Sequence, residues 1–227
     1  MSAVFITGTG TDIGKTLVAR GLIRALRARG RSVEALKPIM TGFEPAEPEG
    51  SDSALLLKAL HRPIDMDGIA QLSPWRFRAP LAPDMAAVRE NRTLDYDGML
   101  AFCRKAVADN TGTLLIEGTG GLMSPIDVTH TNIDWMGALG LPIILVSGTY
   151  LGTISHTLTA LDVLTRRGLT VASVVISQST DNSVRLDETR DTIARFASKL
   201  EILALPRLPG KAEHAVFDQI ADRLAAS

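Results

Sequence analysis

The chain has 227 residues, a hydrophobic content of 45% and a formal net charge of −1. This length suits one domain, spanning residues 1–227, with a substantial core. The charge gives no basic footprint for nucleic acid, and no apolar run approaches the ~20 residues of a membrane span. The chain enters its first apolar run at once, and its single cysteine, Cys103, lies in a helical pattern that predicts a packed core thiol. We therefore expect a cytoplasmic protein that binds neither nucleic acid nor membrane.

Short apolar runs alternate with helical patterns along the chain. The predicted strands are Val4–Ile6, Val33–Leu36, Leu114–Ile116, Ile143–Val146, Val171–Ile176 and Ile202–Ala204. Helices are predicted at residues 14–29, 51–60, 95–109, 131–139, 153–167, 183–198 and 212–225. Most of the strands are continuous apolar runs, as in a parallel sheet covered on both faces. The alternation predicts an α/β fold, a doubly wound and mainly parallel sheet with helices on both faces.

A glycine-rich segment, Gly8–Thr16 (GTGTDIGKT), lies between the first predicted strand and helix. Such a turn presents backbone N–H groups and the positive helix end to a phosphate chain. Lys15 is expected to reach the terminal phosphates, and the Thr16 hydroxyl to ligate Mg²⁺. Thr9 stands where the usual motif has its first glycine, so the loop is a variant. Asp12 either faces a metal ion or a substrate amine, or favours the helix N-terminus. The segment predicts a nucleotide-phosphate site and a fold similar to P-loop NTPases.

Polar residues also follow other predicted strands, at the edge where doubly wound sheets bind ligands. Lys37 follows the second strand and is expected to hold anionic substrate atoms, with Thr41 donating to the same ligand. The alternative for Lys37 is a solvated surface lysine. Glu117 ends the third strand, where a carboxylate usually serves Mg²⁺. Asp52 is either a second metal ligand or a helix N-cap.

Several further segments carry weaker signals. Gly148–His156 and Pro206–Gly210 follow later strands and are candidates for binding substrate and nucleobase, respectively, and we expect His156 itself to be structural. Glu44–Gly50 (EPAEPEG) is predicted to be a surface loop or, alternatively, a lid that orders when substrate binds. Residues 63–94 are irregular and are expected to pack over the sheet as an excursion.

Taken together, the motifs resemble those of the dethiobiotin synthetase family. The resemblance runs from Val4 to about Gly210 and rests on GTGTDIGKT, Leu36–Gly42 (LKPIMTG), Gly50–Asp52 (GSD), Ile116–Gly121 (IEGTGG) and Leu151–His156 (LGTISH). It implies a ligase of biotin biosynthesis that uses ATP, CO₂ or bicarbonate and 7,8-diaminopelargonate (7,8-diaminononanoate). In that reaction a carbamate forms on one amine and ATP phosphorylates it. The second amine attacks the resulting anhydride and closes the cyclic urea of dethiobiotin.

The resemblance also implies the roles of individual residues. Lys15 and Lys37 would be catalytic, Lys15 stabilising the transferring phosphoryl group and Lys37 holding the carbamate. The implied Mg²⁺ ligands are Thr16, Asp52 and Glu117. The implied nucleotide contacts are Asp12, Ile13, Gly14, Lys15, Thr16, Leu17, Glu117, Gly118, Thr119, Gly120, Ser177, Gln178, Pro206, Arg207 and Leu208. The implied substrate contacts are Thr11, Lys37, Thr41, Leu151, Gly152, Thr153 and Ser155, of which the last four would serve the neighbouring subunit of a homodimer.

Three segments depart from the family's usual pattern. Asp84, in Ala82-Pro83-Asp84, replaces a histidine, and Ser155 replaces an asparagine. Ser177-Gln178 stands where an asparagine often reads adenine, so the nucleotide preference stays open. The main alternative function is a ParA- or MinD-like switch ATPase, although such proteins usually place another lysine early in the phosphate loop. A passive nucleotide-binding module is a further alternative. An amide-forming ligase of cobyrinate type is disfavoured. Such enzymes carry a glutaminase domain with a catalytic cysteine, whereas this sequence has only Cys103.

Overall fold

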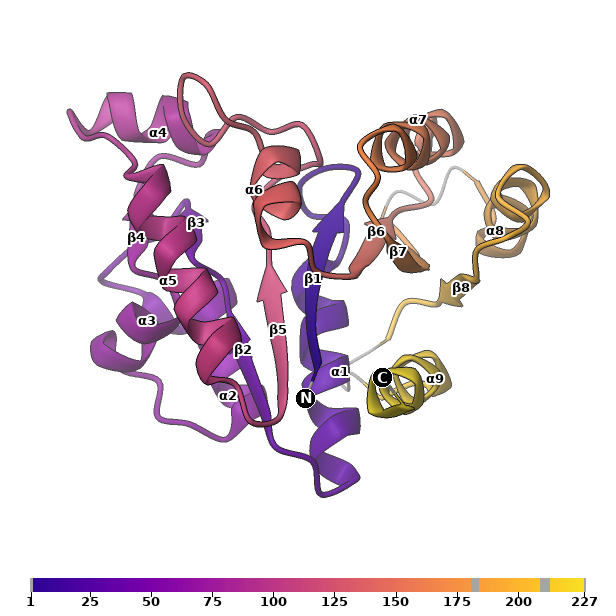
Figure 1. Cartoon of the computed structure of the whole chain (residues 1–227), viewed down its shortest axis with the longest axis horizontal. Helices are drawn as coiled ribbons and strands as arrows, with labels where there is room; N and C mark the ends of the chain where they lie inside the picture. The colour runs from indigo at the N-terminus through magenta and orange to yellow at the C-terminus, as the bar shows by residue number, and fades with distance from the viewer. Residues whose placement is uncertain (1, 181–183, 209–212, 227) are drawn as a thin grey trace.

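The computed structural model describes residues 2–180, 184–208 and 213–226. In these residues a six-stranded sheet has the order β2–β5–β1–β6–β7–β8, and all its neighbouring strands are parallel (Figure 1). The strands are β1 Ser2–Gly8, β2 Val33–Leu36, β5 Thr113–Glu117, β6 Ile143–Ser147, β7 Val171–Ser177 and β8 Ile202–Leu205. Each contains the corresponding predicted strand, so the prediction of a parallel, doubly wound sheet is confirmed.

Helices cover both faces of this sheet. One buried apolar layer joins it to α1 (Lys15–Ala28), α2 (Asp52–Leu60), α3 (Met66–Leu72) and α9 (Ala215–Ala226). The other joins it to α4 (Pro83–Arg89), α5 (Tyr96–Asp109), α6 (Asn132–Leu139), α7 (Thr153–Arg166) and α8 (Leu186–Phe196). In β1, Val4 and Ile6 belong to the first layer. Phe5 belongs to the second, where its ring meets Trp135 edge to face at 4.7 Å. The strand is apolar throughout because successive side chains fill opposite layers.

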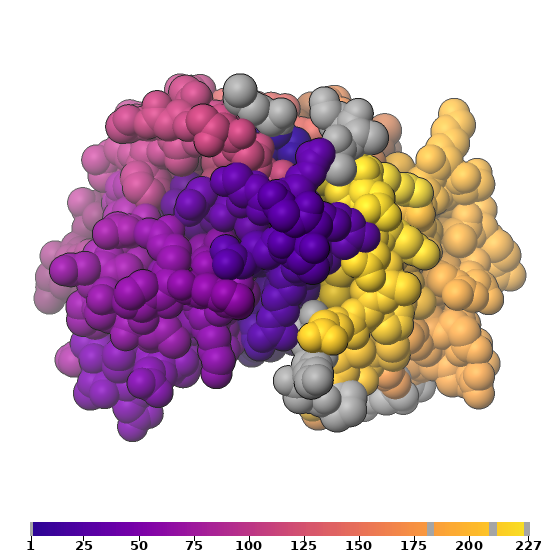
Figure 2. All heavy atoms as spheres, turned by 90° about the horizontal axis from the view of Figure 1, so that it is seen from below, coloured from indigo at the N-terminus to yellow at the C-terminus, as the bar shows by residue number. Residues whose placement is uncertain are grey.

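The C-terminal helix packs beside the first helix. Figure 2 shows the yellow C-terminal segment against the indigo N-terminal part of the chain. A Cβ atom on Gly21 of α1 would come within 2.4 Å of the Phe217 ring of α9, so the small residue permits this close packing. The described residues do not include 183 and 212, at which two of the predicted helices begin. They also do not include Gly210 of the candidate nucleobase segment.

The excursion is more regular than its sequence predicts. It contains α3, β4 (Trp75–Phe77) and α4, and β4 pairs in parallel with β3 (Ile39–Thr41). Thr41, which sequence alone would place in a turn after Lys37, instead ends β3, because Ile39 to Thr41 align with Trp75 to Phe77 in a small second sheet. Within Glu44–Gly50, the last three residues form a short 3₁₀ turn ahead of α2. No helix in the described ranges has the length and apolarity to cross a membrane.

Candidate active site

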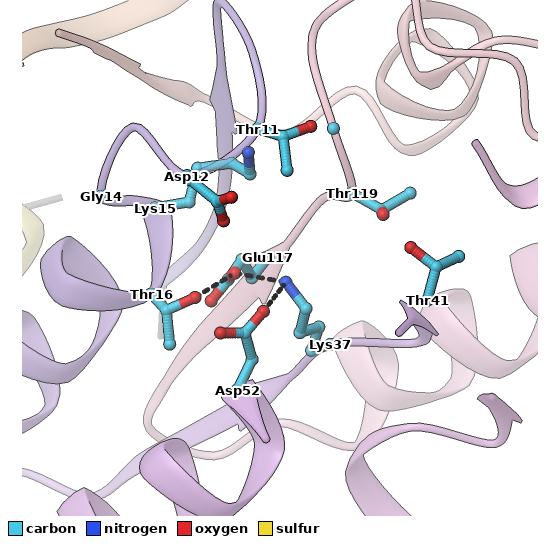
Figure 3. Close-up of a pocket in the computed structure, with 11 residues that line it drawn as sticks. Thr11, Asp12, Gly14, Lys15, Thr16, Lys37, Thr41, Asp52, Glu117 and Thr119 are labelled. Atoms are coloured by element: carbon cyan, nitrogen blue, oxygen red, sulfur yellow. Dashed lines mark hydrogen bonds and ion pairs between the residues drawn. The ribbon is translucent and has the colours of Figure 1, made fainter. Parts of the chain in front are cut away.

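A pocket opens where β1, β2 and β5 end, at the carboxyl edge of the sheet. Its volume is about 310 Å³, and all of the residues that line it are among those implicated from the sequence (Figure 3). They are Thr11, Asp12, Gly14, Lys15, Thr16, Lys37, Thr41, Asp52, Glu117, Thr119 and Gly120. The parallel strands bring these distant parts of the chain together because their carboxyl ends share one edge.

The phosphate loop forms one wall of the pocket. Asp12 and Gly14 have positive φ angles of 55° and 100°, which turn the backbone into the start of α1. The Lys15 ammonium lies back over the loop and donates to the Gly10 carbonyl at 2.6 Å. Burial, together with repulsion from Lys37, lowers the pKa of Lys15 to about 8. Lys15 is therefore poised to exchange a carbonyl for an anionic ligand.

The second lysine forms a buried ion cluster with two carboxylates. Lys37 Nζ lies 2.5 Å from Glu117 Oε1 and 2.9 Å from Asp52 Oδ2 (Figure 3). Thr16 Oγ1 donates to the same Glu117 oxygen at 2.7 Å. Burial disfavours the Lys37 ammonium, but the two carboxylates overcome that cost and raise its pKa above the ordinary value. Lys37 is a permanent cation and not a solvated surface lysine.

Asp52 is free to join the cluster because its neighbour caps the helix. The Ser51 hydroxyl accepts a hydrogen bond from the Ala54 N–H at 3.2 Å, so Ser51 is the N-cap of α2. The alternative role of Asp52 as the N-cap is therefore wrong. Burial opposes ionisation of Asp52, yet the charge and hydrogen bond of Lys37 hold the pKa of this carboxyl below its usual range.

The backbone at Lys37 is fixed by two serines that the sequence reasoning missed. The Ser73 hydroxyl donates to the Lys37 carbonyl at 2.6 Å, and Ser53 Oγ lies 2.5 Å from Ser73 Oγ. Both serines are fully buried, and the Lys37 N–H donates to the Leu72 carbonyl at 3.1 Å. No sequence signal marks them, because their partners lie on separate segments.

The oxygen atoms of the cluster fit a magnesium ion. Mg²⁺ prefers hard oxygen ligands and keeps several waters or phosphate oxygens in its coordination shell. Glu117 Oε2 is buried without a hydrogen-bond partner, which leaves an oxygen available for a cation. Throughout the described ranges, no three His, Cys, Asp or Glu side chains could hold a metal by themselves. A metal at Thr16, Asp52 and Glu117 would therefore need ligands from nucleotide or water as well.

The substrate candidates near α7 lie apart from this pocket. Leu151 is 81% exposed, and Gly152 caps the helix with a φ of 96°. The Thr153 hydroxyl is buried and donates to the Gly148 carbonyl at 2.8 Å, whereas Ser155 is exposed. None of these four residues lines the pocket.

The nucleobase candidates lie at the ends of β7 and β8, also outside the pocket lining. Ser177 is buried next to the phosphate loop, where its Oγ would lie 2.6 Å from a Cβ atom on Gly14. The Gln178 side-chain oxygen accepts from the Arg207 N–H at 3.0 Å, which ties the segment of Pro206 to Leu208 to the end of β7.

Other nucleotide candidates surround the loop without lining the pocket. Ile13 is buried beneath the loop against Gly8, and Gly118 lies against the Phe5 ring. Leu17 is partly buried against the core.

Two residues singled out from the sequence lie elsewhere. Asp84 is in the first turn of α4 and lines a different hollow, where its Oδ1 is buried without a partner. Cys103 is fully buried in α5, and burial raises the pKa of its thiol to about 12. The prediction of a packed core thiol is confirmed.

Comparisons with known proteins identify the family. A model of the AAA domain matches residues 2–214. The ATP-dependent dethiobiotin synthetase BioD of Caulobacter vibrioides (strain NA1000 / CB15N) is 49% identical over 208 residues, covering 91% of this chain and 93% of that protein. The enzyme of the same name from Anaeromyxobacter dehalogenans (strain 2CP-1 / ATCC BAA-258) is 38% identical over 218 residues, covering 95% and 94%.

The solved structures show the fold. The cell-division ATPase MinD of Pyrococcus furiosus superposes with a TM-score of 0.56 at 17% identity, covering 100% of this chain and 99% of that one. This likeness supports the P-loop NTPase-like fold, and the switch-ATPase alternative has only this structural relation behind it. The sequence relatives instead agree with the motifs gathered at the pocket, and the chain belongs to the dethiobiotin synthetase family.

Proposed function

We propose that the protein converts 7,8-diaminononanoate, CO₂ and ATP into dethiobiotin, ADP and phosphate, with the whole chain acting as one catalytic domain. The observation that carries this proposal is the second buried lysine, Lys37, which lies at the same strand edge as the phosphate loop and is 5% exposed. A module that only binds nucleotide has no use for this cation. A reaction with an anionic carbamate beside a triphosphate requires one.

The chemistry explains the need for two lysines. A carbamate carbon is a poor electrophile because its oxygens are poor leaving groups. Transfer of the γ-phosphoryl group to a carbamate oxygen makes that oxygen part of a phosphate leaving group. The second amine then forms the C–N bond while the C–O bond to phosphate breaks, with loss of a proton. Catalysis depends on positioning and on neutralising negative charge.

Lys15 serves the phosphoryl group in this scheme. Its ammonium already extends along the phosphate loop, and a triphosphate offers it stronger, charge-assisted hydrogen bonds than the Gly10 carbonyl does. The N–H groups at the start of α1 add favourable partial charges. The nucleobase would lie toward Ser177, Gln178 and the segment from Pro206 to Leu208.

Lys37 holds the carbamate. Its raised pKa keeps it charged, so it acts as an electrostatic partner of the anion and not as a base. Thr11 and Thr41 line the same pocket as Lys37, and their hydroxyls would orient the substrate (Figure 3). Bound Mg²⁺, held by Thr16, Asp52 and Glu117, would supply charge neutralisation at the phosphate oxygens.

We also propose a homodimer in which Leu151, Gly152, Thr153 and Ser155 serve the substrate of the partner subunit through backbone N–H groups at the start of α7. Leu151 is 81% exposed, so its side chain is accessible to a second copy of the chain. The assignment to the cytoplasm stays a prediction.

Product formation tests the proposed function. Purified protein is incubated with Mg²⁺, bicarbonate and the diamine, with ATP, CTP and GTP in parallel. Equal amounts of dethiobiotin and phosphate support the proposal, and the nucleotide ranking reports how Ser177 and Gln178 affect selectivity. Nucleotide hydrolysis that is indifferent to the diamine, or no turnover, contradicts it.

A further inference from the structure

A chain of hydroxyl groups connects the phosphate loop to α7. Ser147, at the end of β6, is fully buried, and its Oγ lies 2.9 Å from Thr153 Oγ1 and 2.6 Å from Thr157 Oγ1. The same Ser147 oxygen lies 3.2 Å from Thr9 Oγ1, on the phosphate loop. Through Ser147, Thr9 of the phosphate loop is therefore connected to the first turns of α7.

Tyr150 extends this chain to a second hollow. Its hydroxyl oxygen lies 3.3 Å from Thr9 Oγ1 and 2.9 Å from His156 Nδ1. His156 lines a hollow of about 490 Å³ together with Thr9, Gly10 and Thr11. Thr11 also lines the pocket that contains Lys15 and Lys37, so the two spaces are neighbours.

The number of hydroxyl protons determines which group donates and which accepts in this series of hydrogen bonds. Each hydroxyl has one proton, and those of Thr153 and Thr157 are donated to the carbonyls of Gly148 and Thr153. Ser147 must therefore donate to one of these threonines, and it can accept the proton of Thr9. Thr9 can then only accept from Tyr150.

The protonation of His156 at Nδ1 decides what Tyr150 does. When Nδ1 carries a proton it donates to Tyr150, and Tyr150 donates to Thr9, so that Tyr150, Thr9 and Ser147 each give and receive one hydrogen bond. When Nδ1 lacks a proton, Tyr150 donates to His156, and Thr9 loses its donor. A ligand in the hollow that fixes the tautomer of the His156 imidazole thus determines how firmly Thr9 is held.

We propose that Tyr150 is a positioning residue that couples the hollow beside His156 to the phosphate loop, so that the diamine in this hollow tightens nucleotide binding. The inference rests on the proposed function for the identity of the ligand. The coupling passes through Tyr150 and Thr9 and needs no direct contact between diamine and nucleotide.

The test measures nucleotide affinity with and without the diamine. The probe is the Mg²⁺ complex of adenylyl imidodiphosphate, titrated calorimetrically in the absence and presence of saturating diamine and bicarbonate. We expect the diamine to tighten binding to the wild type by about fivefold or more. In Tyr150→Phe this factor falls to about one, while affinity without the diamine stays within about twofold.

Further variants separate coupling from a general loss of structure. Thr9→Val should also abolish the coupling, the double variant with Tyr150→Phe should add nothing, and Thr9→Ser should retain it. Tyr96→Phe is the matched control, because the other tyrosine of the chain stacks on His130 at 3.8 Å and lies on α5. Thr9→Val also keeps the test decisive if Tyr150→Phe does not fold.

Three results would overturn the proposal. The first is that the diamine does not change the nucleotide affinity of the wild type. The second is that it changes the affinity of Tyr150→Phe as much as that of Tyr96→Phe. The third is that Tyr150→Phe or Thr9→Val lowers nucleotide affinity equally with and without the diamine. Product formation is measured on the same wild-type preparation. Product without coupling overturns only the role of Tyr150, whereas absence of product overturns the proposed function as well.

Discussion

Replacing Lys37 by methionine tests whether the buried ion cluster stabilises the fold. Met has a similar length and no charge, so the substitution removes the cation with little change in volume. It leaves the Glu117 carboxylate, 1% exposed, with only the Thr16 hydroxyl as a partner at Oε1. Removing one member of a buried ion pair costs about 3–5 kcal/mol, because the remaining charge is neither solvated nor paired.

The magnitude translates into a measurable shift of the melting temperature. For a chain of this size each kcal/mol lowers the melting temperature by about 2–4 °C, so we expect Lys37→Met to melt about 6–20 °C below the wild type. The assay is thermal unfolding in the presence of EDTA and without nucleotide. Lys58→Met is the matched control, since Lys58 is exposed on α2 and should shift the melting temperature very little.

Magnesium and a double variant sharpen this test. Mg²⁺ at ten times its dissociation constant stabilises the folded state by about 1.4 kcal/mol, and Lys37→Met should bind it more tightly because no ammonium competes for the carboxylates. Lys37→Met combined with Glu117→Gln should recover much of the loss, because no buried charge then lacks a partner. A Lys37→Met melting temperature equal to that of Lys58→Met would refute the reasoning.

Three further outcomes follow from the site. Lys37→Met should bind the Mg²⁺–nucleotide complex but form no dethiobiotin, and normal product formation by this variant would rule out its role in holding the carbamate. The Lys15 pKa of about 8 means that below this pH the lysine is protonated before and after nucleotide binds. Above it the free protein must take up a proton, so nucleotide affinity should fall by up to about tenfold per pH unit, and calorimetry in buffers of different ionisation enthalpy should detect the uptake. An affinity independent of pH above this value would contradict the shift. Gly14→Ala should cost about 1–3 kcal/mol in chemical denaturation and weaken nucleotide binding, because Gly14 has a φ of 100° and a Cβ atom would lie 2.6 Å from Ser177 Oγ. Gly137→Ala in α6, where a Cβ atom meets nothing within 4 Å, is its control, and equal losses in the two variants would refute the argument.

The sheet was predictable because its strands are buried on both faces. A run such as Ile143 to Val146 must be apolar at every position when each side chain enters one layer or the other, and that leaves an unmistakable mark in the sequence. The pairing of Ile39–Thr41 with Trp75–Phe77 was not predictable. Strands of three residues carry no periodicity, and their partners are separated by two helices.

In the candidate site, too, some residues could be predicted from the sequence and others could not. Lys15 could be named from the glycine-rich segment, and Lys37 and Glu117 because one follows and the other ends a recognisable strand. The role of Asp52 could not be decided, because Ser51 and Asp52 are both good N-caps and the choice depends on the distant ammonium of Lys37. Contacts between remote segments decide such cases, and local sequence does not encode them.

The serine pair beside Lys37 shows that the two lysines of the site rest on different parts of the molecule. The phosphate loop is supported by β1 and α1, whereas the backbone of Lys37 is held by Ser53 and Ser73 from α2 and the excursion. A change at Ser73 in the excursion would therefore act on the backbone of the second lysine and not on the elements that support the loop. The placement of the second lysine thus depends on segments that lie far from the phosphate loop in the sequence.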